Sequence, residues 1–312
     1  MISRLFSRVL DSAFVSPLVS AARIPLYVWA SLISQVLIVV TGGVVRLTGS
    51  GLGCPTWPKC TNESLITTPE MGIHGIIEWA NRMLTFVLAL VAVLTFVAIV
   101  RLGKQLRKGL FAPALILGLG IPAQAVLGGF TVLTKLNPWF VGAHFILSGY
   151  MIAVASVLVW RAISSEHTPV SPIMWSMANG IAVVGAIAVV VGVLVTGAGP
   201  HSGDAASVRN GLDLEVWQHF HSYPAYLMLA LVLIQLALMI RRDGKLFGSF
   251  QSKVLTGLLV VTVLQAIVGV AQARLGVPAL LVGIHMLGAA SLCSLLTFQW
   301  LVVRGKPVAR AA

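Results

Sequence analysis

Two glutamine–histidine pairs recur at the same spacing in distant parts of the chain. Gln124 and His144 are 20 positions apart, as are Gln265 and His285, and the second pair follows the first at an offset of 141 residues. Residues between the members of each pair recur at that offset: Ala125, Gly128, Val141 and Gly142 match Ala266, Gly269, Val282 and Gly283. Both histidines lie just inside the start of a long apolar run. Because neutral imidazole is a good ligand for iron, a duplicated chain with an intramembrane histidine in each copy predicts bound heme.

Two other apolar runs also begin with polar clusters, so that four clusters share one depth. They are His74, Glu78, Asn81 and Arg82 in one run, and His219 and His221 in another. A single buried histidine is compatible with an ordinary interhelical hydrogen bond, but ionisable groups at membrane depth point by default to function. Two histidines on facing helices can hold a heme from both sides, and we expect His221, or alternatively His219, to face His285.

The first copy is less complete, because the position that should face His144 holds Asn81, which is a poor iron ligand. His74, Glu78 and Asn81 share one helix face, but His74 lies ~10 Å further along the axis and would need a displaced heme. Glu78 is the only carboxylate well inside an apolar run. It either pairs with Arg82 one turn later or handles protons, and we expect the second role.

The composition is that of a membrane protein, since 58% of the residues are hydrophobic and 10% are charged. Crossing a bilayer takes about 20 apolar residues, and lipid-exposed backbone must be helical. The sequence predicts an all-α integral membrane protein with eight transmembrane helices, at 26–46, 73–100, 110–133, 138–160, 173–196, 216–240, 254–273 and 279–303.

The net charge of +12 reflects topology rather than binding to nucleic acid. If the N-terminus is cytoplasmic, 15 of the 21 basic residues fall on the cytoplasmic side, 5 fall outside, and Arg82 lies within a span. This distribution follows the positive-inside rule and the attraction of basic loops to anionic lipid. We therefore predict a multi-pass protein of the cell membrane, with both termini cytoplasmic and the histidine sites toward the outer side.

Cys54 and Cys60 lie in the loop after the first span, which this topology places outside, where disulfides persist. A disulfide is favoured there, because a metal site would lack a histidine in the same loop. Cys293 is interpreted as a packing residue.

The matched pairs predict two parallel four-helix repeats related by pseudo-two-fold symmetry. The predicted units are a cytoplasmic N-terminal segment 1–25, a first half 26–162, a cytoplasmic linker 163–172, a second half 173–304 and a cytoplasmic tail 305–312.

Several motifs, in this order, resemble the heme A synthase family over about residues 30–300. They are Thr41 to Leu52 followed by Cys54 and Cys60, Ile77 to Arg82, Leu127 to Leu133 with Asn137, Pro138 and His144, Gly197 to Asp204, and Gln265 to His285 with Gly288. The resemblance implies an oxidoreductase that converts a ring methyl of heme O to a formyl, giving heme A for a terminal oxidase.

The resemblance also implies roles for individual residues. His221 and His285 would be the axial ligands of a heme b cofactor in the second half, and His144 would bind the iron of the substrate heme in the first half. Glu78 would act at the reacting methyl. Asn81 departs from the family, many members of which have histidine there, so His74, water or no group at all completes the site. The propionates would pair with an arginine, for which the candidates are Arg46, Arg82 and Arg209.

Implied partners are heme O, heme A, heme O synthase, the lipid bilayer and an electron acceptor that the sequence does not identify, and a homo-oligomer is compatible with the chain. Two other functions use the same residues. A diheme b-type electron-transfer cytochrome would use Glu78 at a quinone site. A transporter would explain the repeats but not the matched histidines.

Overall fold

A computed structural model describes residues 16–163, 171–244, 246–247 and 249–304, and this part of the chain is helical without strands. Its long helices are α2 (Ile24–Leu47), α3 (Gly72–Val100), α4 (Lys104–Leu133), α5 (Pro138–Ile163), α6 (Pro172–Ala198), α7 (Leu214–Asp243), α8 (Phe250–Arg274) and α9 (Ala279–Arg304). Two 3₁₀ turns, η1 (Ala21–Arg23) and η2 (Pro69–Met71), precede α2 and α3. All eight long helices have the length and apolar composition to cross a membrane, which confirms the predicted all-α membrane fold.

Several helices are longer than their apolar runs. Helix α4 begins at Lys104 rather than at 110, because the basic residues before the apolar run are good helix formers. Helix α8 begins at Phe250 rather than at 254, where the Ser249 and Ser252 side chains form a reciprocal capping box. Hydropathy marks the membrane-embedded part of a helix, whereas capping residues mark its actual start.

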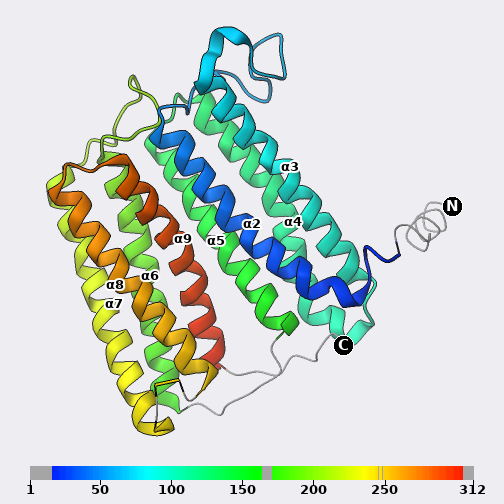
Figure 1. Ribbon diagram of the computed structural model, residues 1–312, viewed down its shortest axis with the longest axis vertical. Coiled ribbons are helices and arrows are strands. Elements are labelled where there is room, and N and C mark those ends of the chain that lie inside the picture. The colour runs from blue at the N-terminus through cyan, green and yellow to red at the C-terminus, as the bar shows by residue number, and fades with distance from the viewer. Residues whose placement is uncertain (1–15, 164–170, 245, 248, 305–312) are drawn as a thin grey trace.

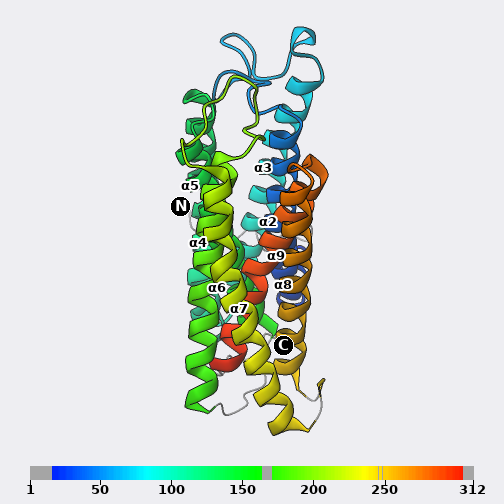
Figure 2. The ribbon, with the colours of Figure 1, turned by 90° about the vertical axis from the view of Figure 1, so that its left-hand side faces the viewer.

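The helices form two groups of four that lie side by side, α2–α5 and α6–α9 (Figure 1). In each group every helix contacts two others in a closed ring, and the groups meet where α5 and α2 contact α9 and where α5 contacts α6. Figure 2 shows that the helices run roughly parallel to the long axis. A two-fold relation that exchanges α2 with α6 and α5 with α9 would also exchange the α2–α9 contact with the α6–α5 contact. The two-fold axis itself stays a prediction. Most of the segment 1–25, most of the linker 163–172 and the tail 305–312 lie outside the described residues.

The hairpins α4–α5 and α8–α9 repeat one another in backbone detail. The Leu136 amide donates to the Thr131 carbonyl over 2.7 Å, and the Val277 amide donates to the Gln272 carbonyl over 2.7 Å, 141 residues later. Positive φ angles also recur at this offset, at Lys135, Leu136, Gly276 and Val277. Non-glycine residues seldom adopt this conformation, so its presence at matched positions supports a common origin of the two hairpins.

Two long loops, 48–68 and 199–213, cover the same end of the molecule, which we call the disulfide end (Figure 1). The Gly51 amide donates to the Gly203 carbonyl over 2.8 Å, which joins one loop to the other. Arg46, near the end of α2, donates to the carbonyls of His201 and Thr196. These bonds tie the loop of each half to the other half, above the helix ends that carry the histidines.

Candidate functional site

His221 and His285 face each other inside the second group of helices. Their ring centroids are 6.2 Å apart, and the ring planes are inclined by 75°. His221 comes from α7 and His285 from α9, which enter the group from the disulfide end. His219 is exposed. The structure therefore brings together His221 and His285 and leaves out the alternative, His219.

One hydrogen bond fixes the tautomer and orientation of the His221 ring. Its Nδ1 lies 3.0 Å from the Ala188 carbonyl oxygen on α6, so Nδ1 carries the proton and Nε2 keeps a free lone pair. Metal-binding histidines are commonly held in this way through their second nitrogen. The Nδ1 atom of His285 is buried and has no partner among the described residues.

The spacing of the pair fits a metal ion bound between two imidazoles. An imidazole nitrogen lies about 2 Å from a bound transition metal, and its ring centroid lies about 1 Å further, so two axial rings place their centroids roughly 6 Å apart. The observed 6.2 Å agrees with this requirement. The donor set also agrees, because paired neutral imidazoles are characteristic axial ligands of b-type heme.

Each of three buried histidines packs against a glycine of the neighbouring helix. A Cβ atom added to Gly128, Gly192 or Gly269 would lie 3.3, 2.9 or 3.4 Å from Cε1 of the adjacent histidine. The histidines are, in the same order, His144, His221 and His285. Glycine lets the backbone approach the imidazole edge, and the same histidine–glycine packing occurs at all three positions.

The matched glutamines make the same hydrogen bond in both halves. Gln124 Nε2 donates to the His144 carbonyl over 3.3 Å, and Gln265 Nε2 donates to the His285 carbonyl over 3.0 Å. The Gln124 side chain also donates to Ser148 over 2.7 Å. The sequence repeat thus reflects a conserved way of fixing the helix turn that presents each histidine.

In the first half, the described residues leave several buried polar atoms without a partner. These atoms are Asn81 Oδ1, His144 Nδ1, Gln124 Oε1 and Trp79 Nε1. Buried polar atoms are nearly always satisfied, so each of these atoms marks a place for a ligand or water. The described part of the second half has four such atoms as well, Ser207 Oγ, Gln272 Oε1, His285 Nδ1 and Gln299 Oε1. His74 is elsewhere: it is exposed, and its Nδ1 lies 2.9 Å from Ser50 Oγ in the loop 48–68.

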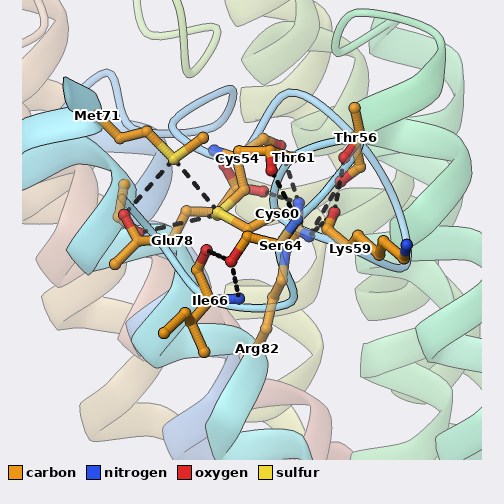
Figure 3. The surroundings of a disulfide bond; sticks show 12 residues. Cys54, Thr56, Lys59, Cys60, Thr61, Ser64, Ile66, Met71, Glu78 and Arg82 are labelled. Atoms are coloured by element: carbon orange, nitrogen blue, oxygen red, sulfur yellow. Dashed lines mark hydrogen bonds and ion pairs between the residues drawn. A yellow bond between two sulfur atoms is a disulfide. The ribbon is translucent and has the colours of Figure 1, made fainter. Parts of the chain in front are cut away.

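Glu78 is buried beneath a disulfide loop (Figure 3). Cys54 and Cys60 form the predicted disulfide, and both residues are 0% exposed. The Cys54 amide donates to Glu78 Oε2 over 2.7 Å, while Arg82 binds Glu78 Oε1 at 2.5 Å. The ion pair considered from the sequence is therefore present. The Gly53 amide is a further backbone donor to this carboxylate.

Arg82 joins helix α3 to the disulfide loop (Figure 3). Besides Glu78, its guanidinium donates to the carbonyls of Cys54, Thr56 and Lys59 at 2.9, 3.0 and 3.2 Å. A planar guanidinium has five N–H donors in a fixed fork and suits such a set of acceptors. Arg82 thus fixes the loop over the carboxylate.

A family model described as cytochrome oxidase assembly protein, COX15-CtaA, matches residues 25–297. This range includes all eight long helices, although α9 extends a little beyond it. The chain belongs to this family.

Curated relatives include proteins named heme A synthase. The one from Geobacillus thermodenitrificans is 27% identical over 148 residues, covering 46% of this chain and 44% of that protein. The one from Bacillus pumilus is 31% identical over 144 residues, covering 45% of this chain and 46% of that protein. The chain thus matches about half the length of these relatives. A protoheme IX farnesyltransferase from Thermus thermophilus is 37% identical over 62 residues, which is 10% of its length.

For this COX15-CtaA family chain, the structure also shows what the candidate propionate partners bind. Arg46 and Arg82 donate to backbone carbonyls of the loops, as described above, and Arg209 donates to the carbonyls of Pro200 and Ser207. A propionate that pairs with any of them would use the N–H groups that these carbonyls leave free, since a guanidinium has five.

Sequence reasoning missed two contributors to the site, the Ala188 carbonyl and Gly192, because α6 carries no counterpart of the glutamine–histidine pattern. Gly128 and Gly269 were visible as residues that recur at the offset of 141.

Proposed function

We propose that this chain is a heme A synthase, which oxidises a ring methyl of heme O to a formyl and supplies heme A to a terminal oxidase. The observation that carries the proposal is the difference between the two halves. The second half has two facing imidazoles suited to a permanent heme, whereas the first half has one imidazole, Asn81 where the second half has His221, and a buried carboxylate three residues before Asn81. A site for a permanent cofactor is expected to hold the heme with two strong ligands, whereas a substrate site must release its heme.

The second half would hold heme b through His221 and His285, and this cofactor would supply one-electron redox chemistry when bound. The protein holds His221 through the Ala188 carbonyl and accommodates both rings at Gly192 and Gly269. Two strong ligands from one rigid bundle favour a heme that stays bound.

The first half would receive heme O, with His144 as the ligand of its iron. Asn81 would not add a second strong ligand, and its unpartnered oxygen is available to water or to a porphyrin substituent. A heme held by one imidazole is released more readily than one held by two, as a substrate and its product require. His74 would remain with Ser50 in the loop.

Oxidation of the methyl group, R–CH3 plus water to R–CHO, releases four protons and four electrons. The electrons would leave to an acceptor outside the chain. We assign Glu78 to proton transfer at the reacting carbon, because it is a buried carboxylate on the same helix face as Asn81 and is held in one orientation by the Cys54 amide and Arg82. Arg82 and the Cys54 amide would keep the carboxylate in one orientation while a proton arrives.

The distribution of basic residues sets the proposed orientation of the protein in the membrane. Positive loops would face the cytoplasm, and the disulfide end with both heme sites would face outward. Heme O would come from a heme O synthase, and heme A would pass to the oxidase within the bilayer.

Pigment analysis tests the function directly. The chain would be expressed in a host that makes heme O, and the extracted hemes would be separated by chromatography and identified by mass. We expect heme A from the wild-type protein and from Glu70→Gln, since Glu70 is an exposed residue of η2. We expect none from Glu78→Gln, although this variant should still retain its resident heme.

Heme A from Glu78→Gln at the wild-type level would remove Glu78 from the chemistry. Bound heme b without any heme A from the wild-type protein would refute the synthase and favour the diheme electron-transfer cytochrome.

A further inference from the structure

We propose that an apolar groove between α3 and α4 holds the isoprenoid tail of the substrate heme. This inference rests on the proposed function, because it concerns how the substrate of that reaction binds. Heme O differs from protoheme in carrying a farnesyl-derived chain, and a site that acts on heme O must accommodate this chain.

The groove has a volume of about 200 Å³ and only apolar residues line it. Ala89, Ala92 and Phe96 contribute from α3, and Leu115, Gly118 and Pro122 contribute from α4. For comparison, an apolar cavity of about 150 Å³ is large enough to bind benzene. The groove can therefore take several isoprenoid carbons, and its exposed lining is almost entirely apolar.

The same two helices connect the groove to the candidate substrate site. Ala89 follows Asn81 by eight residues and Pro122 precedes Gly128 by six, which correspond to about 12 Å and about 9 Å along a helix. A farnesyl-derived chain, with C–C bonds of about 1.5 Å, extends on the order of 15 Å. A porphyrin beside His144 would thus place the end of its tail in the groove.

The groove residues can be compared with residues at the matching positions of the second half. The buried residues of the helices in the two halves fix which positions match. The buried residues Leu117 and Ile121 of α4 match the buried residues Leu258 and Thr262 of α8 at the offset of 141. At this register, Gly118 of the groove corresponds to Leu259.

Helices α3 and α7 align at an offset of 140, which pairs Asn81 with His221. The buried residues Thr95 and Ile99 then match the buried residues Gln235 and Met239. Two further groove residues, Ala89 and Ala92, correspond to Leu229 and Val232. At these three groove positions the first half thus has smaller side chains than the half assigned to heme b, which has no tail. At four other groove positions the first half has the larger residue: Phe96, Leu115, Leu119 and Ile121 correspond to Leu236, Thr256, Val260 and Thr262. The difference is therefore local to the part of the groove around Ala89, Ala92 and Gly118.

Gly118 allows a clean test, since a Cβ atom added to it meets no atom within 4 Å. Gly118→Leu should fill the groove without disturbing the helices, and Ala89→Leu is a second variant that does the same from α3. The matched control is Gly257→Leu on α8, where the added Cβ would make only an ordinary 3.7 Å contact with Leu295.

Heme O and protoheme IX would each be titrated into the purified protein that carries its resident heme, and difference absorbance would give both dissociation constants. We expect Gly118→Leu and Ala89→Leu to weaken heme O binding about tenfold and to leave protoheme binding unchanged. The effect is moderate because a tail excluded from the groove still lies in lipid and loses only packing contacts. The control should match the wild-type protein.

Two results would overturn the subsite. Unchanged heme O affinity in both groove variants would mean that the tail lies elsewhere and that membrane lipid occupies the groove. An equal loss for heme O and protoheme would mean that the groove supports the fold rather than the tail. Either result can occur while the wild-type protein still makes heme A, so failure of the subsite is distinguishable from failure of the proposed function.

Discussion

Replacing Arg82 with methionine should open the disulfide loop. The substitution keeps an unbranched apolar stem but removes the donors to Glu78 and to three loop carbonyls. Glu78 is 5% exposed, and after the substitution its carboxylate keeps only backbone amide donors, those of Cys54 and Gly53, and has no cationic partner in the cluster. Removing one partner of a buried ion pair costs about 3–5 kcal/mol.

We expect this cost to appear as faster reduction of the disulfide. Both cysteines are 0% exposed, so a thiol reagent reaches them only when the loop leaves α3. When opening and closing are fast, the reaction rate follows the population of the open form. At about 1.4 kcal/mol per factor of ten, a cost of 3 kcal/mol increases the rate by roughly 150-fold.

The assay would combine a water-soluble reductant with a maleimide label and would follow the mass increase of the protein over time. Arg209→Met is the matched control, because Arg209 binds the carbonyls of Pro200 and Ser207 in the other loop. Rates for Arg82→Met within threefold of wild type would refute the argument that Arg82 holds the loop closed.

Three further outcomes concern the histidine sites. His221→Ala should lose the resident heme, measured by absorbance per mole of purified protein, whereas His219→Ala should retain it; equal heme content in both would contradict the assignment. Gly192→Ala should weaken retention of that heme by about tenfold, since the new Cβ would lie 2.9 Å from Cε1 of His221; time-resolved transfer of heme to an acceptor protein would measure this. Asn81→His should give the substrate heme a bis-imidazole spectrum with His144 and slow multiple turnover more than single turnover, and an unchanged spectrum would refute the idea that Asn81 keeps this site open.

Much of the fold could be predicted because membrane insertion requires long apolar helices. Eight such runs, their order and the disulfide followed from hydropathy, loop charge and the positions of Cys54 and Cys60. Helix ends such as Lys104 and Phe250 could not be predicted in this way, since they depend on capping and on polar residues outside the apolar runs.

Some features of the candidate site could likewise be predicted from the sequence, and others could not. Gln124 and Gln265 were visible because duplicated residues leave a numerical offset, and the structure shows each binding the carbonyl of its matched histidine. The sequence already favoured His221 over His219, and the structure places His221 beside His285 and leaves His219 exposed. The contacts of Arg82 with the loop could not be predicted, because they depend on the path of an irregular segment, which leaves no periodic pattern in the sequence.

The contacts of the disulfide loop connect the cysteine pair to the Glu78 carboxylate, which the sequence alone does not show to be in contact. The Cys54 amide that caps Glu78 belongs to a residue of the buried disulfide. Opening the loop at Cys54 therefore removes one donor from Glu78, whereas opening it only around Cys60 leaves that bond in place. Attack of an external thiol on Cys54 and orientation of Glu78 by the Cys54 amide are thus coupled, and Arg82, which binds both Glu78 and the Cys54 carbonyl, strengthens that coupling.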